Sequence, residues 1–177
     1  MSGTSIYESA FAQSDKTDAI LVVEGKKLHV NKAHLSVHSD YFNTLFNGEF
    51  KEKSMPEIPI EDVDFEDFAT LLSLVHPNPI KPAAPDCEKL LEYADRFMLP
   101  GVKPYIELVL LRSQIHCSSK ILIGGRYGLD DLLDNGISSV KVSNWDYNDV
   151  ISSDDFKELP EATQLKITLK IIKIANC

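Results

Sequence analysis

The chain has 177 residues, enough for one generous domain or for a domain with a smaller companion. Its apolar fraction of 44% and charged fraction of 25% are ordinary for a soluble globular protein and exclude disorder along the whole length. Its net charge of −9 argues against nucleic acid and anionic membrane surfaces as direct partners, because both attract basic proteins.

The first elements predicted are a short helix and a β-hairpin. Ser5–Glu8 has the spacing of a capping box, which indicates a short helix or an ordered arm near the N-terminus. The dense apolar run Ala19–Val23 predicts a buried strand. Glu24–Gly25 supplies a turn, and the alternation over Lys27–Val30 predicts the hairpin partner.

Two short helices and another strand are expected next. Asn31 is placed to cap the first helix, and Ser39 or Asp40 to cap the second, which should end at Asn47–Gly48. Pro56–Ile60 predicts a short strand. Its prolines favour a sheet edge or a strand end, because proline cannot donate a backbone hydrogen bond.

The rest of the chain is predicted to be mostly helical. Apolar residues three and four apart predict an amphipathic helix over residues 65–75. Residues 76–85 contain four prolines and should form a loop, with helices predicted over 86–98 and 104–111. Residues 112–177 are predicted to be all-helical. Their last helix begins near Pro160 and carries basic residues towards its C-terminal end.

The cysteines indicate a reducing compartment. Cys87, Cys117 and Cys177 are odd in number and widely spaced, which fits neither a disulfide framework nor a zinc site. The N-terminal segment lacks the basic start and apolar run of a signal peptide, and no stretch approaches the roughly 20 apolar residues of a membrane span. Cytoplasmic or nuclear localisation is the expectation.

Three histidines are close enough in sequence to be considered as metal ligands. His34 and His38 are four residues apart and would share a helix face, and His29 lies nearby. A metal site would need a third ligand and a supporting shell of hydrogen bonds, and no HExxH motif is present. Exposed or capping histidines are therefore the favoured interpretation, and no metal or cofactor is expected.

The remaining candidate motifs also have structural explanations. Gly124, Gly125 and Gly128 do not form a GxGxxG or a phosphate-binding loop, so a turn or tight helix packing is predicted. The carboxylate pairs Asp130–Asp131 and Asp154–Asp155 lie at the starts of predicted helices, where they favour the helix dipole. No nucleophile, base and oxyanion hole can be assembled, so the chain is not expected to be an enzyme.

The negative charge is concentrated in the first part of the chain. Residues 1–111 carry 10 basic and 18 acidic side chains, against 8 and 9 in residues 112–177. Six carboxylates with no basic neighbour in sequence form what we call the acidic cluster: Glu57, Glu61, Asp62, Asp64, Glu66 and Asp67. Charge alone is consistent with a solubilising surface or with one side of an interface to a basic partner.

The segment from Asp18 to Phe42 resembles the opening of a BTB/POZ domain. The family pattern is an Asp before an apolar strand, a hairpin, and then HKxxLxxxSxxF, matched here by Lys32, Leu35, Ser39 and Phe42. Asn31 replaces the usual His, as in invertebrate members that pair a BTB with a MATH domain; no MATH segment is recognised here. Residues 90–98 and the helix after them resemble the closing LLxxAxx[FY]x[LI] segment.

This resemblance implies an α+β fold, a small β-sheet flanked by α-helices, followed by an all-helical extension. The expected parts are an N-terminal arm over residues 1–17, a BTB/POZ domain over 18–111, and a BACK-like extension over 112–177. The match to a BACK domain is loose, because the expected Ala is missing from residues 123–127.

The resemblance also implies a protein-interaction module rather than an enzyme. Many such domains form homodimers or pair with another BTB protein, and many bind cullin-3 as substrate adaptors of a ubiquitin ligase. In that group an apolar-x-Glu motif follows the second short helix. Phe50-Lys51-Glu52 stands in that place, so Phe50 and Glu52 are the predicted cullin-binding residues. Asp18 and Lys32 match the family's charged pair near the dimer interface.

Two functions remain open from the sequence. The first is a dimeric cullin-3 adaptor for an unidentified substrate protein, in which the acidic cluster steers the partner in a salt-sensitive manner. The second is a dimerisation scaffold or transcriptional co-regulator that binds no cullin. They are distinguished by what Phe50 and Glu52 contact.

Overall fold

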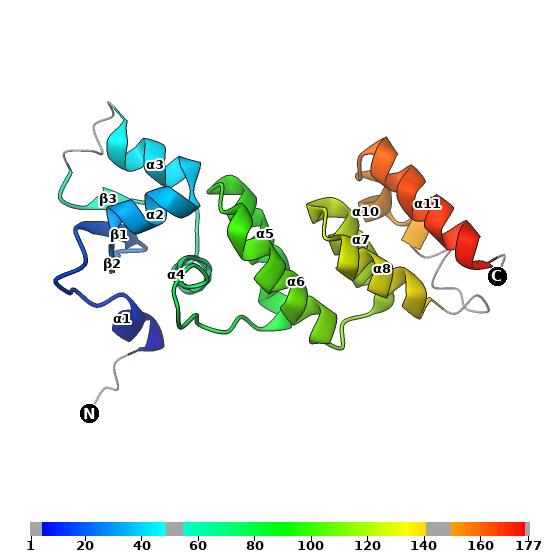
Figure 1. Ribbon diagram of the computed structural model, residues 1–177, viewed down its shortest axis with the longest axis horizontal. Helices are drawn as coiled ribbons and strands as arrows, with labels where there is room; N and C mark the ends of the chain where they lie inside the picture. The colour runs from blue at the N-terminus through cyan, green and yellow to red at the C-terminus, as the bar shows by residue number, and fades with distance from the viewer. Residues whose placement is uncertain (1–4, 49–54, 141–149, 176–177) are drawn as a thin grey trace. The chain divides into compact units, whose positions relative to one another are not determined.

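The computed structural model of the chain describes residues 5–48, 55–140 and 150–175 (Figure 1). The contacts divide it into two compact units, Met1–Lys103 and Pro104–Cys177. Each unit has its own architecture. The first contains a small sheet with helices, and the described part of the second is helical.

The sheet of the first unit is built on the predicted hairpin. Strands β1 (Ala19–Val23) and β2 (Lys26–Val30) pair antiparallel, with Leu21 opposite Leu28. Their two-residue turn places both Glu24 and Gly25 at positive φ, 49° and 75°, which matches the twist of a tight hairpin. The hairpin is confirmed.

A third strand completes this sheet from a distant part of the chain. β3 (Ile58–Pro59) pairs parallel to β1, giving the order β2-β1-β3 and placing β3 at an edge. The strand is shorter than the predicted Pro56–Ile60, but its edge position is the one that the prolines indicated.

The N-terminal segment forms helix α1 (Ile6–Ala10), and its predicted capping box is present between Ser5 and Glu8. Figure 1 shows this helix below the sheet. Tyr7 meets Phe65 edge to face, with 6.0 Å between the ring centroids. Phe11 is buried, and its carbonyl accepts a hydrogen bond from the His29 backbone N–H at 3.1 Å. The segment is thus tied to β2 and to the start of α4.

Helices α2 (Lys32–His38) and α3 (Asp40–Asn47) follow the hairpin, each with a side-chain cap. Asn31 accepts from the His34 N–H at 2.7 Å, as predicted. Of the two candidates for the second cap, Ser39 is the one used, and it accepts from the Phe42 N–H at 3.1 Å. Its hydroxyl also donates to the Phe97 carbonyl at 2.6 Å.

The remaining helices of the first unit enclose an aromatic core. They are α4 (Phe65–Ser73), the short 3-10 turn η2 (Ala84–Asp86), α5 (Cys87–Arg96) and a second 3-10 turn, η3 (Pro100–Val102). The Phe42 and Phe97 rings stack at 6.0 Å between centroids, and Phe68 meets Phe97 edge to face at 5.0 Å. All three rings are buried.

Helix α5 ends earlier than the sequence pattern predicts. The amphipathic pattern continues to Met98, whereas the helix ends at Arg96. Met98 adopts a φ of 49° and is exposed, and the next N–H, of Leu99, bonds back to the Ala94 carbonyl at 2.8 Å. The left-handed conformation of Met98 ends the helix in place of the glycine that is common at helix ends. The spacing of apolar residues therefore did not predict where the helix ends.

Helix α6 (Lys103–Arg112) opens the second unit, which continues with α7 (Cys117–Tyr127), α8 (Asp130–Ser139), α10 (Asp154–Lys157) and α11 (Glu161–Ala175). The all-helical prediction is confirmed for the described residues. Residues 141–149 lie outside them. Ile167 and Ile171 of α11 are buried in one apolar core with Ile121, Leu133 and Phe156.

The glycines of α7 allow that helix to approach α8 closely, as the sequence suggested. A Cβ added to Gly124 would lie 2.7 Å from the Leu133 backbone nitrogen and 2.9 Å from its Cα. Gly128 closes α7 at a φ of 69°, the left-handed conformation common after helix ends. Close helix packing explains Gly124 and the end of the helix explains Gly128, without a phosphate-binding loop.

We predict that Gly124→Ala destabilises the second unit by about 1–3 kcal/mol, because the new methyl group meets backbone that cannot rotate away. Gly125→Ala is the matched control in the same helix. Its Cβ would meet only side-chain ends, the nearest being Ile167 Cδ1 at 3.0 Å. Urea denaturation followed by circular dichroism measures both variants, and equal losses of stability would contradict the prediction.

Candidate functional site

The predicted cullin-binding residues Phe50 and Glu52 lie outside the described residues. The structure describes the segments on either side of them. Helix α3 ends at Asn47 with Gly48 as its cap, and the described chain resumes at Met55, three residues before β3. Met55 is 40% exposed. An exposed apolar side chain thus lies close in sequence to the predicted motif.

Two basic residues distant in sequence lie against the acidic cluster. Lys27 of β2 forms an ion pair with Glu57. Arg96, at the end of α5, donates to the Asp62 carbonyl at 2.8 Å and to the Glu61 carbonyl at 2.9 Å. These basic residues are not neighbours of the acids in sequence. Folding brings Lys27 of β2 and Arg96 of α5 to them. One carboxylate of the cluster, Glu57, is therefore paired within its own unit, while Arg96 is bound to the backbone beside two others.

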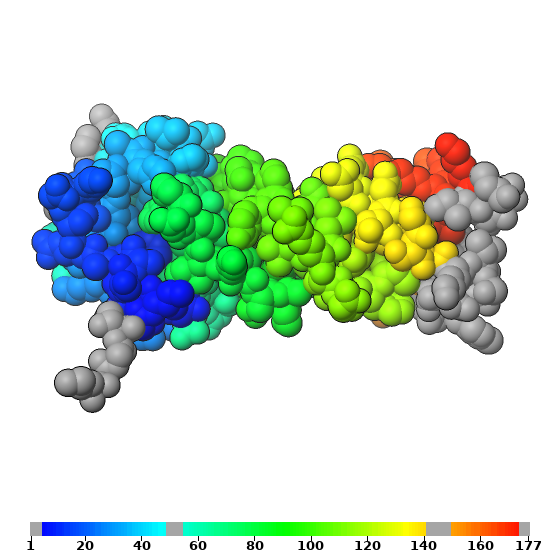
Figure 2. Space-filling view, turned by 60° about the horizontal axis from the view of Figure 1, so that its bottom comes forward, coloured from blue at the N-terminus to red at the C-terminus, as the bar shows by residue number. Residues whose placement is uncertain are grey.

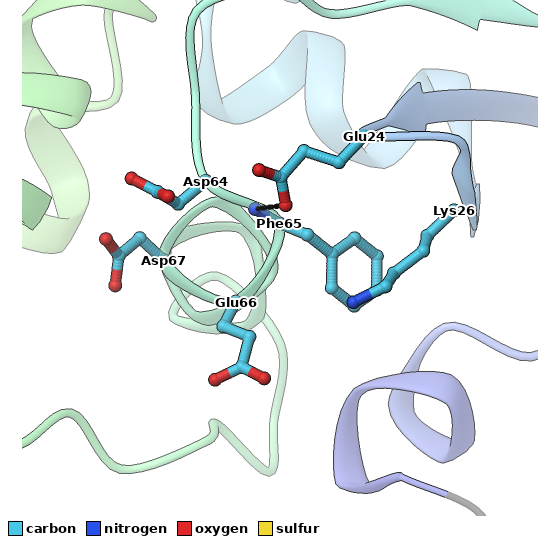
Figure 3. A pocket seen from close by; sticks show the side chains of 6 residues that line it. All are labelled: Glu24, Lys26, Asp64, Phe65, Glu66 and Asp67. Atoms are coloured by element: carbon cyan, nitrogen blue, oxygen red, sulfur yellow. Dashed lines mark hydrogen bonds between the residues drawn. The ribbon is translucent and has the colours of Figure 1, made fainter.

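The start of α4 is capped by a carboxylate from the hairpin turn. Glu24 Oε2 accepts from the Phe65 N–H at 3.2 Å, while the preceding Asp64 makes no side-chain cap bond (Figure 3). Lys26 lies over the Phe65 ring, its Nζ 4.6 Å from the centroid. These residues line an open hollow of about 320 Å³ together with Glu66 and Asp67.

Asp67 differs from the other carboxylates around this hollow. Figure 3 shows Asp64 and Asp67 pointing away from Lys26. Burial raises the pKa of Asp67 above its ordinary value, and repulsion from Asp64 and Asp86 adds to this increase more than attraction to Lys89 reduces it. Asp67 therefore holds its proton more readily than an ordinary aspartate.

Asp18 and Lys32, the predicted dimer-interface pair, are brought together in the monomer. Asp18 Oδ1 accepts from the Lys32 backbone N–H at 2.8 Å, at the first residue of α2. The Lys32 ammonium lies instead over the Phe46 ring, 5.9 Å from its centroid. The contact is thus a helix-end hydrogen bond rather than an ion pair between the two side chains.

The histidines considered as metal ligands separate in the structure. His34 and His38 lie together, with ring centroids 4.8 Å apart, whereas His29 is on β2. The sequence did not reveal His76, whose ring is 5.4 Å from that of His34, because the two lie on different elements. His34 Nε2 is 3.1 Å from the Val75 carbonyl. The described residues contain no group of three or more side chains arranged to hold a metal ion.

The three clustered histidines predict a loss of stability in acid. Burial lowers the pKa of His76 below its ordinary value of 6.5, and His34 and His38 lower it further. The unfolded chain therefore binds this proton more readily than the folded chain. The free energy of unfolding should fall as the pH drops from above 6.5 towards the folded-state pKa.

In His76→Gln this pH dependence should be weaker than in the wild type. His29→Gln, which replaces a histidine outside this cluster, is the comparison variant. Urea denaturation at pH 7 and pH 5 measures the difference. A wild-type acid dependence that survives intact in His76→Gln would contradict the assignment to His76.

The sequence places the chain in a known family. Residues 7–114 match the family profile of the BTB/POZ domain, so the chain belongs to the BTB/POZ family. It is 36% identical over 166 residues to the BTB/POZ domain-containing protein Y57A10B.3 of Caenorhabditis elegans, covering 93% of this chain and 52% of that one. It is 30% identical to the BTB and MATH domain-containing protein 38 of the same organism, covering 96% and 44%.

One solved structure is similar to part of this chain. The BTB domain of human gigaxonin aligns with a TM-score of 0.45 and 20% identity, covering 60% of this chain and 93% of that one. The chain spans about half the length of the curated relatives that it matches.

Family membership supports a protein-interaction module. BTB domains serve as interaction modules, and the match covers the hairpin and helices of the first unit and the beginning of the second. Among the described residues, no helix combines the length and apolar character needed to cross a membrane.

Proposed function

We propose that this protein is a dimeric adaptor that binds cullin-3 and holds a substrate protein near a ubiquitin ligase. The proposal depends on one observation: Phe50-Lys51-Glu52 follows α3 within the matched BTB/POZ domain, where the adaptor group carries its apolar-x-Glu motif. An aromatic anchor beside a carboxylate is a typical arrangement at the centre of an interface. The adaptor makes and breaks no bond, and acts by raising the effective concentration of substrate.

The flanking structure favours this site for a partner. Met55 is exposed, and Lys27 of β2 forms an ion pair with Glu57, the residue before β3. An exposed apolar side chain and a charged pair therefore lie close in sequence to the motif. The domain boundaries of 1–17, 18–111 and 112–177, cytoplasmic or nuclear localisation, and steering by the acidic cluster remain predictions within this proposal.

We predict that Phe50→Ala combined with Glu52→Ala weakens binding to purified cullin-3 at least about tenfold, because it removes both the anchor and its carboxylate. Ile6→Ala combined with Asp15→Ala is the matched control, since it removes one exposed apolar and one exposed acidic side chain elsewhere in the first unit. Isothermal titration calorimetry measures both. Unchanged binding in the first double variant would reject the adaptor motif, and absence of wild-type binding at micromolar cullin would favour the scaffold function.

We predict that the wild-type chain is a dimer by light scattering and that Asp18→Asn raises its dissociation constant several-fold. Asn keeps an oxygen acceptor for the Lys32 N–H, so the substitution removes charge while keeping the helix-end hydrogen bond. Asp15→Asn, a nearby exposed carboxylate in the same segment, is the control. A monomeric wild type would contradict the dimer, and equal effects of the two variants would contradict the role of Asp18.

A further inference from the structure

A row of aromatic rings connects the N-terminal segment to helix α2. The His76 ring lies 5.4 Å from that of Phe11 and 5.4 Å from that of His34, measured between centroids. His34 in turn lies 4.8 Å from His38, one turn further along α2. His76 itself belongs to the loop after α4. A histidine, which can take up a proton near neutral pH, therefore lies between the N-terminal segment and two further histidines.

Phe11 is the one buried residue of the N-terminal segment over residues 5–16. It is 2% exposed, and its carbonyl accepts the His29 N–H of β2, a strand at the edge of the described sheet. Residues 12–16 are exposed, and at their end the Asn31 side chain donates to the Lys16 carbonyl at 2.7 Å. Figure 2 shows the N-terminal residues, in blue, at the surface of the first unit. The part before this anchor can therefore leave the sheet while the anchor stays in place.

The surroundings of His76 oppose its charged form. Burial lowers the pKa of His76 most and His34 and His38 lower it further, while no described carboxylate acts to raise it. His34 can take up a proton and keep its contact, because its Nε2 still donates to the Val75 carbonyl when both ring nitrogens are protonated. The other charged residues on these segments point elsewhere: Glu8, Asp15 and Lys16 are exposed, and the Lys32 ammonium lies over the Phe46 ring.

We propose that the three histidines form an acid-sensitive latch, which holds the N-terminal segment against the sheet near neutral pH and releases it in acid. Protonation of His34 and His76 places two positive charges in adjacent rings. Rotation of His76 into solvent relieves both their repulsion and the burial of its charge. Phe11 then loses the ring that packs against it, and the segment detaches. This release frees the His29 N–H at the edge of β2, a donor that another extended segment can use. The latch is independent of cullin binding.

The test is hydrogen exchange of the full chain, followed by NMR at pH 7 and pH 5 and corrected for the intrinsic effect of pH on exchange. The His29 amide reports the latch because its acceptor is Phe11. The Ile60 amide reports the sheet, because it donates to the Val22 carbonyl at 2.9 Å on the side of β1 away from β2. We expect the protection of His29 to fall at least about fivefold at pH 5 while that of Ile60 changes less than about twofold.

Two results in the wild type would overturn the latch. An equal fall in protection at His29 and Ile60 would show that acid unfolds the whole unit rather than releasing the segment. Unchanged or increased protection of His29 would show that the histidine cations are tolerated against Phe11, for example by attraction to its ring.

Variants assign the effect to the cluster. His76→Gln cannot take up a proton at this position, so its acid loss of His29 protection should shrink to less than about twofold. His34→Gln keeps His76 but removes the neighbouring charge, and should also reduce the loss; it replaces His76→Gln as the test if that variant already loosens the segment at pH 7. His116→Gln, a histidine of the second unit, is the matched control and should retain the full loss. A loss equal to that of the wild type in the deciding variant, or a loss abolished in His116→Gln, would overturn the proposal.

Discussion

The first unit depends on one buried hydroxyl. Ser39 caps α3 through the Phe42 N–H and donates to the Phe97 carbonyl, 58 residues later. The residue is 2% exposed, so both bonds are shielded from water, and losing the hydroxyl would leave a buried carbonyl unsatisfied. These bonds fix the start of α3 at the end of α5, where the Phe42 and Phe97 rings stack nearly parallel, 10° apart. The Ser39 hydrogen bonds and the stacking of Phe42 on Phe97 therefore both require α3 to pack against the end of α5.

Local elements were predictable because their signals are local. The Asn31 cap, the tight turn at Glu24–Gly25 and the edge strand near Pro59 each follow from a few adjacent residues. The contacts of Arg96 with the Glu61 and Asp62 carbonyls were not predictable, because they join residues more than 30 positions apart and arise only in the folded chain. The predicted site was likewise only partly predictable. The family resemblance suggested that Asp18 and Lys32 form a pair, but it did not reveal that Asp18 accepts a hydrogen bond from the Lys32 backbone N–H.

The second unit shows how small residues and charges combine to hold helices together. Gly124 and Gly136 bring α7 and α8 into close backbone contact, since a Cβ on either would lie within 3.0 Å of neighbouring backbone atoms. Lys166 and Lys170 of α11 form ion pairs with Asp130 and Asp134 of α8. Exposed pairs of this kind contribute little energy, so the apolar core around Ile167 provides the stability and the ion pairs favour one register of α11.

The acidic cluster is less uniform than the sequence suggests, and this changes what a partner would encounter. Lys27 pairs with the Glu57 carboxylate, and Arg96 bonds to the backbone carbonyls of Glu61 and Asp62, whereas Asp67 is repelled by Asp64 and Asp86. The Debye length is about 8 Å at physiological salt, so net charge summed over the unit has little reach. Recognition of a basic partner by this surface would therefore be short-ranged.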